Sequence, residues 1–367
     1  MNDTNTFSKE SSIKLKGIAI IMMLIHHCFR TADRFEGYSV LLFPLKEQQL
    51  INIAETCKIC VSMFAFITGY GLFLNYQNHR GTAQRWVAKR YIKSFSGYWF
   101  IWIFCMIFSQ LKDGRVTEIL FTDGKPLGIT YSLLSLLGIN NIFGTPSIDY
   151  RWWYMSAAFL FIFITPVIYR YKNDMWMVLV GVILFLRVII SYDGTAVAIS
   201  SESVYAFLVP YVLGAIFARY DFIDRWCSIR KKKPLIKMYR FAVEIWVIIL
   251  LYKAFLGIPK YLFWEFHYGV FSLTVIMFFV EFILPIKFMS PLLIILGKNS
   301  MNIYLVHSLI QMYYPKLIYQ NKHFAVSVLI LLFVSICASV VLESLKKIIR
   351  YDKMITKIKC KIDAVMI

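Results

Sequence analysis

The stretch KLKGIAIIMMLIHHCFR, residues 14–30, holds an apolar run between basic residues and decides the fold class. About 20 mostly apolar residues in a row are enough for a helix to cross a bilayer. Stretches of this kind recur along the 367 residues, of which 59% are hydrophobic and only 17% are charged. A soluble domain has about 25% charged residues. The sequence therefore predicts an all-α integral membrane protein.

Ten segments are long and apolar enough to be transmembrane helices. They are residues 13–30, 52–74, 94–111, 152–170, 175–192, 203–219, 240–257, 263–284, 291–312 and 323–343. Residues 126–143 are apolar but short and interrupted by glycine, which predicts an interfacial or re-entrant segment. Because no linker or internal repeat divides the chain, residues 1–367 are predicted to form a single polytopic membrane domain.

The distribution of charge predicts the orientation, since cytoplasmic loops of membrane proteins are enriched in Lys and Arg. With both termini cytoplasmic, the inside segments of a ten-span protein hold 26 of the 40 Lys and Arg, and the outside segments hold 11. An eleventh span at 126–143 would move the eight basic residues of 219–240 outside, against this rule. Cytoplasmic loops thus explain the net charge of +19, and we expect the lipid bilayer, not nucleic acid, as the partner.

Lys16 and His27 in the first span are the strongest catalytic candidates. Ionisable side chains are costly inside a membrane and are for that reason functional candidates. Eleven positions at 100° per residue leave the two about 20° from eclipsed on one helix face, and about 16 Å apart along the axis. A neutral histidine can accept a proton, and packing between helices is the structural alternative. His26 points about 100° away from this face.

Three further segments contain candidate residues. FAFITGYGLF, residues 64–73, has glycines that allow close approach of a substrate or of a second helix. RWVAKRYIKSFSGYW, residues 85–99, is suited to clamping phosphates, although a cytoplasmic loop is basic in any case. LGKNSMNIYLVH, residues 296–307, places a histidine in an apolar run. Cys57 and Cys60 have zinc-like spacing, but no second pair or His cluster completes the site, so no metal is predicted.

The order of these segments resembles the acyltransferase-3 family of membrane acyltransferases. That family opens on an Arg and a His separated by ten residues, and here Lys16 and His27 have this spacing. FAFITGY is similar to its second-span motif, and KRYIK, residues 89–93, is similar to its basic R-x-x-R entry to the third span. RWWYMSAAFLFIFITP, residues 151–166, resembles its fourth-span segment, and LGKNSMNIYLVHSLI, residues 296–310, resembles its late signature.

The resemblance implies transfer of an acyl group, usually acetyl from acetyl-CoA, to a carbohydrate hydroxyl. The acceptor would be a bacterial surface polysaccharide or its lipid-linked precursor, and the location the bacterial cytoplasmic membrane. In this interpretation His27 acts as general base or transiently carries the acyl group, with Lys16 on the same helix face. The CoA phosphates would be bound by Lys89, Arg90 and Lys93. Candidate acceptor contacts are Arg151, Trp153, Thr68, Gly69 and His307.

Two other functions stay open at this point. A transporter or flippase of a lipid-linked sugar also needs ten or more spans and buried charges, but the chain shows no inverted repeat. A polysaccharide polymerase would be expected to have a larger and more basic outer loop than residues 112–151.

Overall fold

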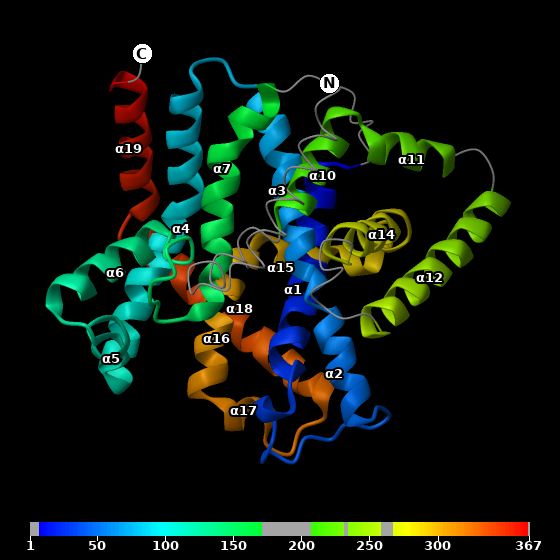
Figure 1. The fold of residues 1–367 in the computed structure, drawn as a ribbon, viewed down its shortest axis with the longest axis horizontal. Helices are drawn as coiled ribbons and strands as arrows, with labels where there is room; N and C mark the ends of the chain where they lie inside the picture. The colour runs from blue at the N-terminus through cyan, green and yellow to red at the C-terminus, as the bar shows by residue number, and fades with distance from the viewer. Residues whose placement is uncertain (1–6, 171–206, 231–233, 258–266, 366–367) are drawn as a thin grey trace. The chain divides into compact units, whose positions relative to one another are not determined.

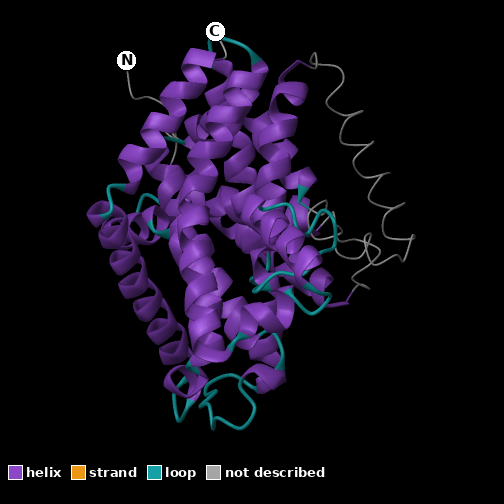
Figure 2. Ribbon diagram, turned by 90° about the vertical axis from the view of Figure 1, so that its left-hand side faces the viewer, coloured by secondary structure: helices purple, strands orange, loops and turns teal. Residues whose placement is uncertain are grey.

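The structure is a computed structural model that describes residues 7–170, 207–230, 234–257 and 267–365. These residues form helices joined by loops, and no strand occurs among them (Figure 2). One isolated bridge joins Leu41 to His323. The prediction of an all-α protein is confirmed for this part of the chain.

The chain forms two compact units, each assembled from three separate segments. Unit 1 comprises Met1–Leu74, Val209–Ser300 and Ile310–Val334. Unit 2 comprises Asn75–Leu208, Met301–Leu309 and Ser335–Ile367. Neither unit is a continuous segment, and a single domain over residues 1–367 stays a prediction.

Unit 1 is organised around α1, which packs along α15 and against α2 (Figure 1). Ser8 caps the start of α1, where its hydroxyl oxygen accepts a hydrogen bond of 3.2 Å from the Ser11 N–H. The helices of this unit are α1 (Lys9–Phe29), η1 (Ala32–Arg34), α2 (Glu47–Thr56), α3 (Ile59–Gln77), α10 (Leu208–Arg219), α11 (Phe222–Arg230), α12 (Pro234–Gly257), η4 (His267–Phe271), α14 (Ser272–Phe278), η5 (Phe279–Ile283), η6 (Lys287–Met289), α15 (Ser290–Lys298) and α17 (Pro315–Tyr319).

Two glycines let α1 and α15 approach each other backbone to backbone. A Cβ atom at Gly17 would overlap the carbonyl oxygen of Leu293, and one at Gly297 would overlap that of Ile13. Any side chain at either position would therefore push the helices apart. Because Gly17 follows Lys16 directly, this contact fixes the part of α1 to which Lys16 belongs.

Unit 2 is built on the long helix α4, which contacts α5, α7 and α19. Figure 1 shows α19 running beside α4, where the Tyr351 hydroxyl donates to the carbonyl oxygen of Ser96 at 2.8 Å. The helices of this unit are α4 (Ala83–Asp113), α5 (Arg115–Leu120), α6 (Lys125–Leu137), η2 (Tyr150–Trp153), α7 (Tyr154–Arg170) and α19 (Tyr351–Val365). Two further helices, α16 (Ser300–Tyr313) and α18 (Phe324–Ile348), are divided between the two units, and the end of α3 after Leu74 and the first residue of α10 also belong to unit 2.

Among the described residues, five helical segments are long and apolar enough to cross a membrane, or six if one bent pair is a single span. The five are Lys9–Phe29, Glu47–Gln77, Ala83–Asp113, Tyr150–Arg170 and Phe324–Ile348. They coincide with the predicted spans at 13–30, 52–74, 94–111, 152–170 and 323–343. These apolar segments agree with a multi-pass membrane protein.

The remaining predicted spans that the structure describes are divided or differ in length. Tyr268–Ile283 and Lys287–Lys298 meet at a bend of 106°, and the predicted span 291–312 is split between α15 and α16. The split lies at Asn299, whose side-chain amide donates to the carbonyl oxygen of Ile295 at 2.8 Å and so caps the end of α15.

Two other predicted spans differ in length from their helices. At the predicted span 203–219, α10 is shorter, with 12 residues, and at 240–257, α12 is longer, with 24 residues. The helix α6, with 13 residues, is too short for a span, and none was predicted at residues 126–143. Residues 175–192 lie outside the described part of the chain. A total of ten spans with cytoplasmic termini stays a prediction.

Candidate active site

The first span is one unbroken helix from Lys9 to Phe29, so the spacing of Lys16 and His27 on one face holds in the structure. Both side chains are half-buried. A separation of about 16 Å along the axis is too long for the two side chains to act on the same atom. Their arrangement instead suits an extended substrate with a charged group at one end and the reacting group at the other.

The two adjacent histidines have different environments. His26 is 5% exposed, and its Nδ1 lies 2.8 Å from the carbonyl oxygen of Ala54 in α2. A carbonyl can only accept, so this Nδ1 carries the proton and His26 ties α1 to α2. The ring of His27 lies edge-on to that of His26, with centroids 5.1 Å apart, and is half-buried. The geometry thus gives His26 a structural contact to α2.

The last turn of α1 is held by side chains from outside the helix. The backbone carbonyl of His27 accepts hydrogen bonds of 2.8 Å from Arg34 Nη1 and from Gln311 Nε2. The next carbonyl, that of Cys28, accepts from the Tyr319 hydroxyl at 3.3 Å. The last carbonyls of a helix have no partner within it, so these donors satisfy them and fix the backbone of His27.

Arg34, Gln311 and Tyr319 were not among the residues predicted from the sequence. Gln311 could have been identified as a candidate, because it is a polar residue within the predicted span 291–312. Its partner was not predictable, since 284 positions separate Gln311 from His27.

In α3, Gly69 packs directly against the backbone of α10. A Cβ at Gly69 would overlap the carbonyl oxygen of Tyr211, and one at Gly214 would overlap that of Phe66. This contact accounts for Gly69 as a helix-packing residue. Thr68, the next residue along, is half-buried. A role of Thr68 and Gly69 in substrate binding stays a prediction.

The basic residues of α4 belong to unit 2. Lys89 and Arg90 are half-buried, and Lys93, one turn after Lys89, is exposed. The Nε atom of Arg90 is buried and has no hydrogen-bond partner among the described residues. Buried N–H groups are nearly always paired, so this guanidinium is suited to an anion that completes its hydrogen bonding.

The η2 segment docks onto α16 through several hydrogen bonds within unit 2. The Trp152 indole N–H donates to the carbonyl oxygen of Leu305 at 3.0 Å, and Arg151 Nη1 donates to that of Ser308 at 3.2 Å. In the reverse direction, the Tyr304 hydroxyl donates to the carbonyl oxygen of Arg151 at 2.7 Å. Trp153 is half-buried and stacks on Phe207 with ring centroids 5.3 Å apart.

Asp149, which precedes η2, was also missed at the sequence level. Its Oδ1 accepts a hydrogen bond of 2.9 Å from the Arg151 N–H and so caps η2. The side chain is 6% exposed. Burial raises the pKa of the Asp149 carboxyl above its ordinary value, although the positive charge of Arg151 favours the charged form.

His307 is fully buried in α16. Its Nδ1 lies 2.7 Å from the carbonyl oxygen of Tyr304, one turn earlier. The proton is therefore on Nδ1, and the lone pair of the neutral ring is on Nε2. The contact fixes the ring relative to Tyr304, which in turn binds the backbone of Arg151.

The structure thus distributes the predicted residues over two sets. Lys16, His27, Thr68 and Gly69 belong to unit 1, and Lys89, Arg90, Lys93, Arg151, Trp153 and His307 belong to unit 2. No group of three or more His, Cys, Asp or Glu side chains suited to a metal ion occurs in the described ranges. The catalytic and binding roles of all these residues stay predictions.

Comparison with known families gives the decisive match. The model of the acyltransferase domain family (Acyl_transf_3) matches residues 13–344, nearly the whole chain. The chain belongs to the acyltransferase-3 family. Comparison with curated proteins and with solved structures found no match. Family membership and the apolar helices together make this chain a membrane acyltransferase.

Proposed function

We propose that this acyltransferase-3 member transfers an acetyl group from acetyl-CoA to a hydroxyl of a carbohydrate. The acceptor is a bacterial cell-surface polysaccharide or its lipid-linked precursor, and the enzyme acts in the cytoplasmic membrane. The observation that carries the proposal is the pair Lys16 and His27 on one face of an unbroken helix, in a chain that matches the family over residues 13–344.

In the proposed reaction, His27 acts as the general base. It takes the proton of the acceptor hydroxyl as the oxygen attacks the acetyl carbonyl carbon. The new C–O ester bond forms, the C–S bond of the thioester breaks, and the proton leaves with the thiolate as free CoA. An acyl-histidine intermediate is the alternative route, in which His27 attacks first and the acceptor displaces it.

The donor is proposed to bind through its phosphates. Coenzyme A is cytoplasmic and polyanionic, and Lys and Arg form charge-assisted hydrogen bonds with phosphate oxygens. Lys16 provides a cation about 16 Å from His27. On α4, Lys89, Arg90 and Lys93 provide three more, and the buried Nε of Arg90 supports an anion partner there. No metal is required for this chemistry.

The acceptor contacts are proposed from the second set of residues. Arg151 and Trp153 lie in η2, which the hydrogen bonds to α16 hold in place. A guanidinium and an indole ring suit the hydroxyls and the apolar faces of a sugar ring. His307 lies in the same unit, and its Nε2 has the lone pair that can accept a hydrogen bond from a sugar hydroxyl. Thr68 and Gly69, which belong to the first set, are proposed as acceptor contacts from the sequence resemblance alone.

The test is transfer of radiolabel from [acetyl-¹⁴C]acetyl-CoA in membranes that contain the chain and its host glycan. We expect label in the glycan fraction with wild-type protein, and loss of that label after mild alkaline treatment, which cleaves esters. Membranes without the chain provide the background. Label at background level with wild-type protein present at matched amounts would contradict an acetyl transfer. Uptake of glycan into vesicles without label would instead favour a transporter.

A further inference from the structure

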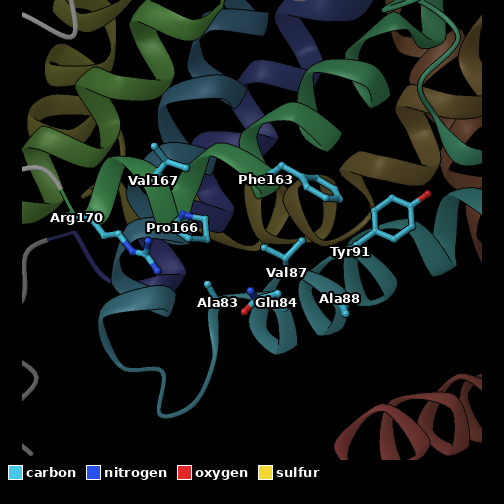
Figure 3. A pocket seen from close by; sticks show the side chains of 9 residues that line it. All are labelled: Ala83, Gln84, Val87, Ala88, Tyr91, Phe163, Pro166, Val167 and Arg170. Carbon is cyan, nitrogen blue, oxygen red and sulfur yellow. The ribbon is translucent and has the colours of Figure 1, made fainter. Parts of the chain in front are cut away.

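A groove between α4 and α7 is not used by the proposed reaction. Its volume is about 500 Å³, within the roughly 300–1,000 Å³ of small-molecule pockets. One wall is the first part of α4 and the other is the last part of α7, and both walls belong to unit 2. The lining residues are Ala83, Gln84, Val87, Ala88, Tyr91, Phe163, Pro166, Val167 and Arg170 (Figure 3).

The groove is polar at one end and aromatic at the other. Arg170 and Tyr91 lie at opposite ends (Figure 3), with Gln84 on the α4 wall. At the Tyr91 end, the ring of Phe159 lies 5.6 Å from that of Tyr91 and stacks on Phe163 at 4.4 Å. Between the ends, the lining side chains are aliphatic. A ligand that fits is therefore apolar along its length, with an anionic group at one end.

The wall of α7 is shaped by Pro166. Proline has no N–H, so the carbonyl of Ile162 loses its helix partner. Proline inside a helix also bends it or opens it, and here it lies on the groove wall itself. The flanking side chains Phe163 and Val167 are 46% and 52% exposed. Within the described part of the chain, the apolar face of the groove is thus open.

The dimensions match one lipid chain. From Phe163 to Arg170, the α7 wall rises about 10 Å within the predicted span 152–170, and one leaflet contributes about 15 Å of the roughly 30 Å hydrocarbon core. Both walls belong to helices long and apolar enough to cross a membrane. Arg170 ends α7, and an Arg at the end of a span lies where lipid phosphates lie.

We propose that this groove binds one acyl chain of an anionic glycerophospholipid, whose phosphate pairs with Arg170. The acyl chain lies along Val87, Ala88 and Val167, and its end contacts Tyr91 and Phe163. The arm of CoA fits the groove less well, because its amide groups need hydrogen-bond partners. Among the lining side chains, only Gln84, Arg170 and Tyr91 have a polar group. The Tyr91 hydroxyl already donates to the carbonyl oxygen of Leu137 at 2.8 Å.

The test is native mass spectrometry of the full-length protein released from detergent, with phosphatidylglycerol or phosphatidylcholine added at equal concentration. We expect wild-type protein to retain phosphatidylglycerol about fivefold better than phosphatidylcholine, since one basic residue near a charged lipid contributes about that factor. Arg170→Gln removes this preference, and Val167→Trp, which fills the groove, lowers the retention of both lipids.

The controls keep the substitution types but move them out of the groove. Lys112→Gln lies at the other end of α4, and Ile107→Trp replaces a side chain that is 57% exposed on the same helix. Both should retain phosphatidylglycerol as wild type does, and elution as a single peak confirms folding of every variant. Equal retention of both lipids by wild type, or unchanged retention in Val167→Trp, would overturn the proposal. So would displacement of phosphatidylglycerol by stoichiometric polyprenyl phosphate, which would assign the groove to a lipid-linked acceptor.

Discussion

The side-chain amide of Gln311 donates a hydrogen bond of 2.8 Å to the backbone carbonyl of His27. The same carbonyl accepts from Arg34 at 2.8 Å. Two residues far apart in the chain therefore determine where the last turn of α1 lies, and with it the side chain proposed as general base. A positioning role of this kind is separable from catalysis, because neither donor touches the His27 ring through these bonds.

Gln311→Leu is expected to lower kcat for acetyl transfer about tenfold and to leave KM for acetyl-CoA within about twofold. The variant loses the hydrogen bonds of Gln311 to the His27 carbonyl and to the Tyr319 hydroxyl. Each such loss costs about 1 kcal/mol, and a small displacement of a catalytic group is costly in rate. Steady-state release of CoA thiol measures both constants. The control is Gln320→Leu, an exposed glutamine after α17, which should leave both constants unchanged. A wild-type kcat in Gln311→Leu would contradict the positioning role.

Gly17→Ala is expected to destabilise the protein by at least about 2 kcal/mol, because the new methyl group would overlap the carbonyl oxygen of Leu293. The matched control is Gly71→Ala, at a helical glycine with nothing within 4 Å of the added atom. Alanine there should be neutral or stabilising by up to about 1 kcal/mol. Thermal unfolding in detergent, followed by tryptophan fluorescence, compares the two. Equal midpoints would refute the close packing of α1 on α15.

Arg90→Gln is expected to raise KM for acetyl-CoA about tenfold with little change in kcat, because a contact to the CoA phosphates acts on binding. High salt should reduce the difference in KM between wild type and variant, since it screens the attraction between Arg90 and the CoA phosphates. Lys112→Gln, an exposed substitution at the far end of α4, is the control. If Arg90→Gln lowers kcat and leaves KM unchanged, Arg90 does not bind the donor phosphates.

Asp149→Asn tests the buried carboxyl before η2. Because burial raises its pKa, the folded state favours the protonated form, and its contribution to stability is lost as pH rises through the folded-state pKa. Asn keeps an acceptor for the Arg151 N–H. We expect the melting temperatures of variant and wild type to be closest at pH 4 and to separate toward pH 7, with the variant higher.

The control for this prediction is Asp33→Asn, at an exposed aspartate in η1. The melting temperature of this variant should change with pH in the same way as that of wild type between pH 4 and pH 7. A variant that melts below wild type at pH 7 would show that the electrostatic attraction of the Asp149 carboxylate to Arg151 outweighs the cost of its burial.

The sequence alone was sufficient for the helices whose apolar residues form one long run. Residues 13–30 and 323–343 are such runs, and α1 and α18 lie there. It was not sufficient at 291–312, where the average composition is apolar although Lys298, Asn299 and Ser300 interrupt the run, and the backbone does not remain one helix. The reason is local, because the Asn299 side chain caps the end of α15, and a hydropathy pattern does not register a single capping residue.

The candidate site likewise includes residues that the sequence identified and residues that it missed. Lys16 and His27 were identified because their spacing is a property of one helix. Asp149, Gln311 and Tyr319 were missed because their partners lie on other segments, and such contacts leave no periodic pattern. The contact of Gly69 with the backbone of Tyr211 also could not be distinguished from a substrate contact by the sequence, since both require the same small residue.

The central claim is tested most directly by the acetyl content of cell-surface glycan, measured by proton NMR at matched membrane levels of protein. Cells with wild-type chain, His27→Ala, His26→Ala and a deletion are compared. His27→Ala should fall to the deletion level, because loss of a general base costs about 10²–10⁴ in rate. His26→Ala should keep measurable acetylation, provided that the variant folds. Equal acetylation in wild type, His27→Ala and the deletion would contradict an acetyl-transfer function in that host.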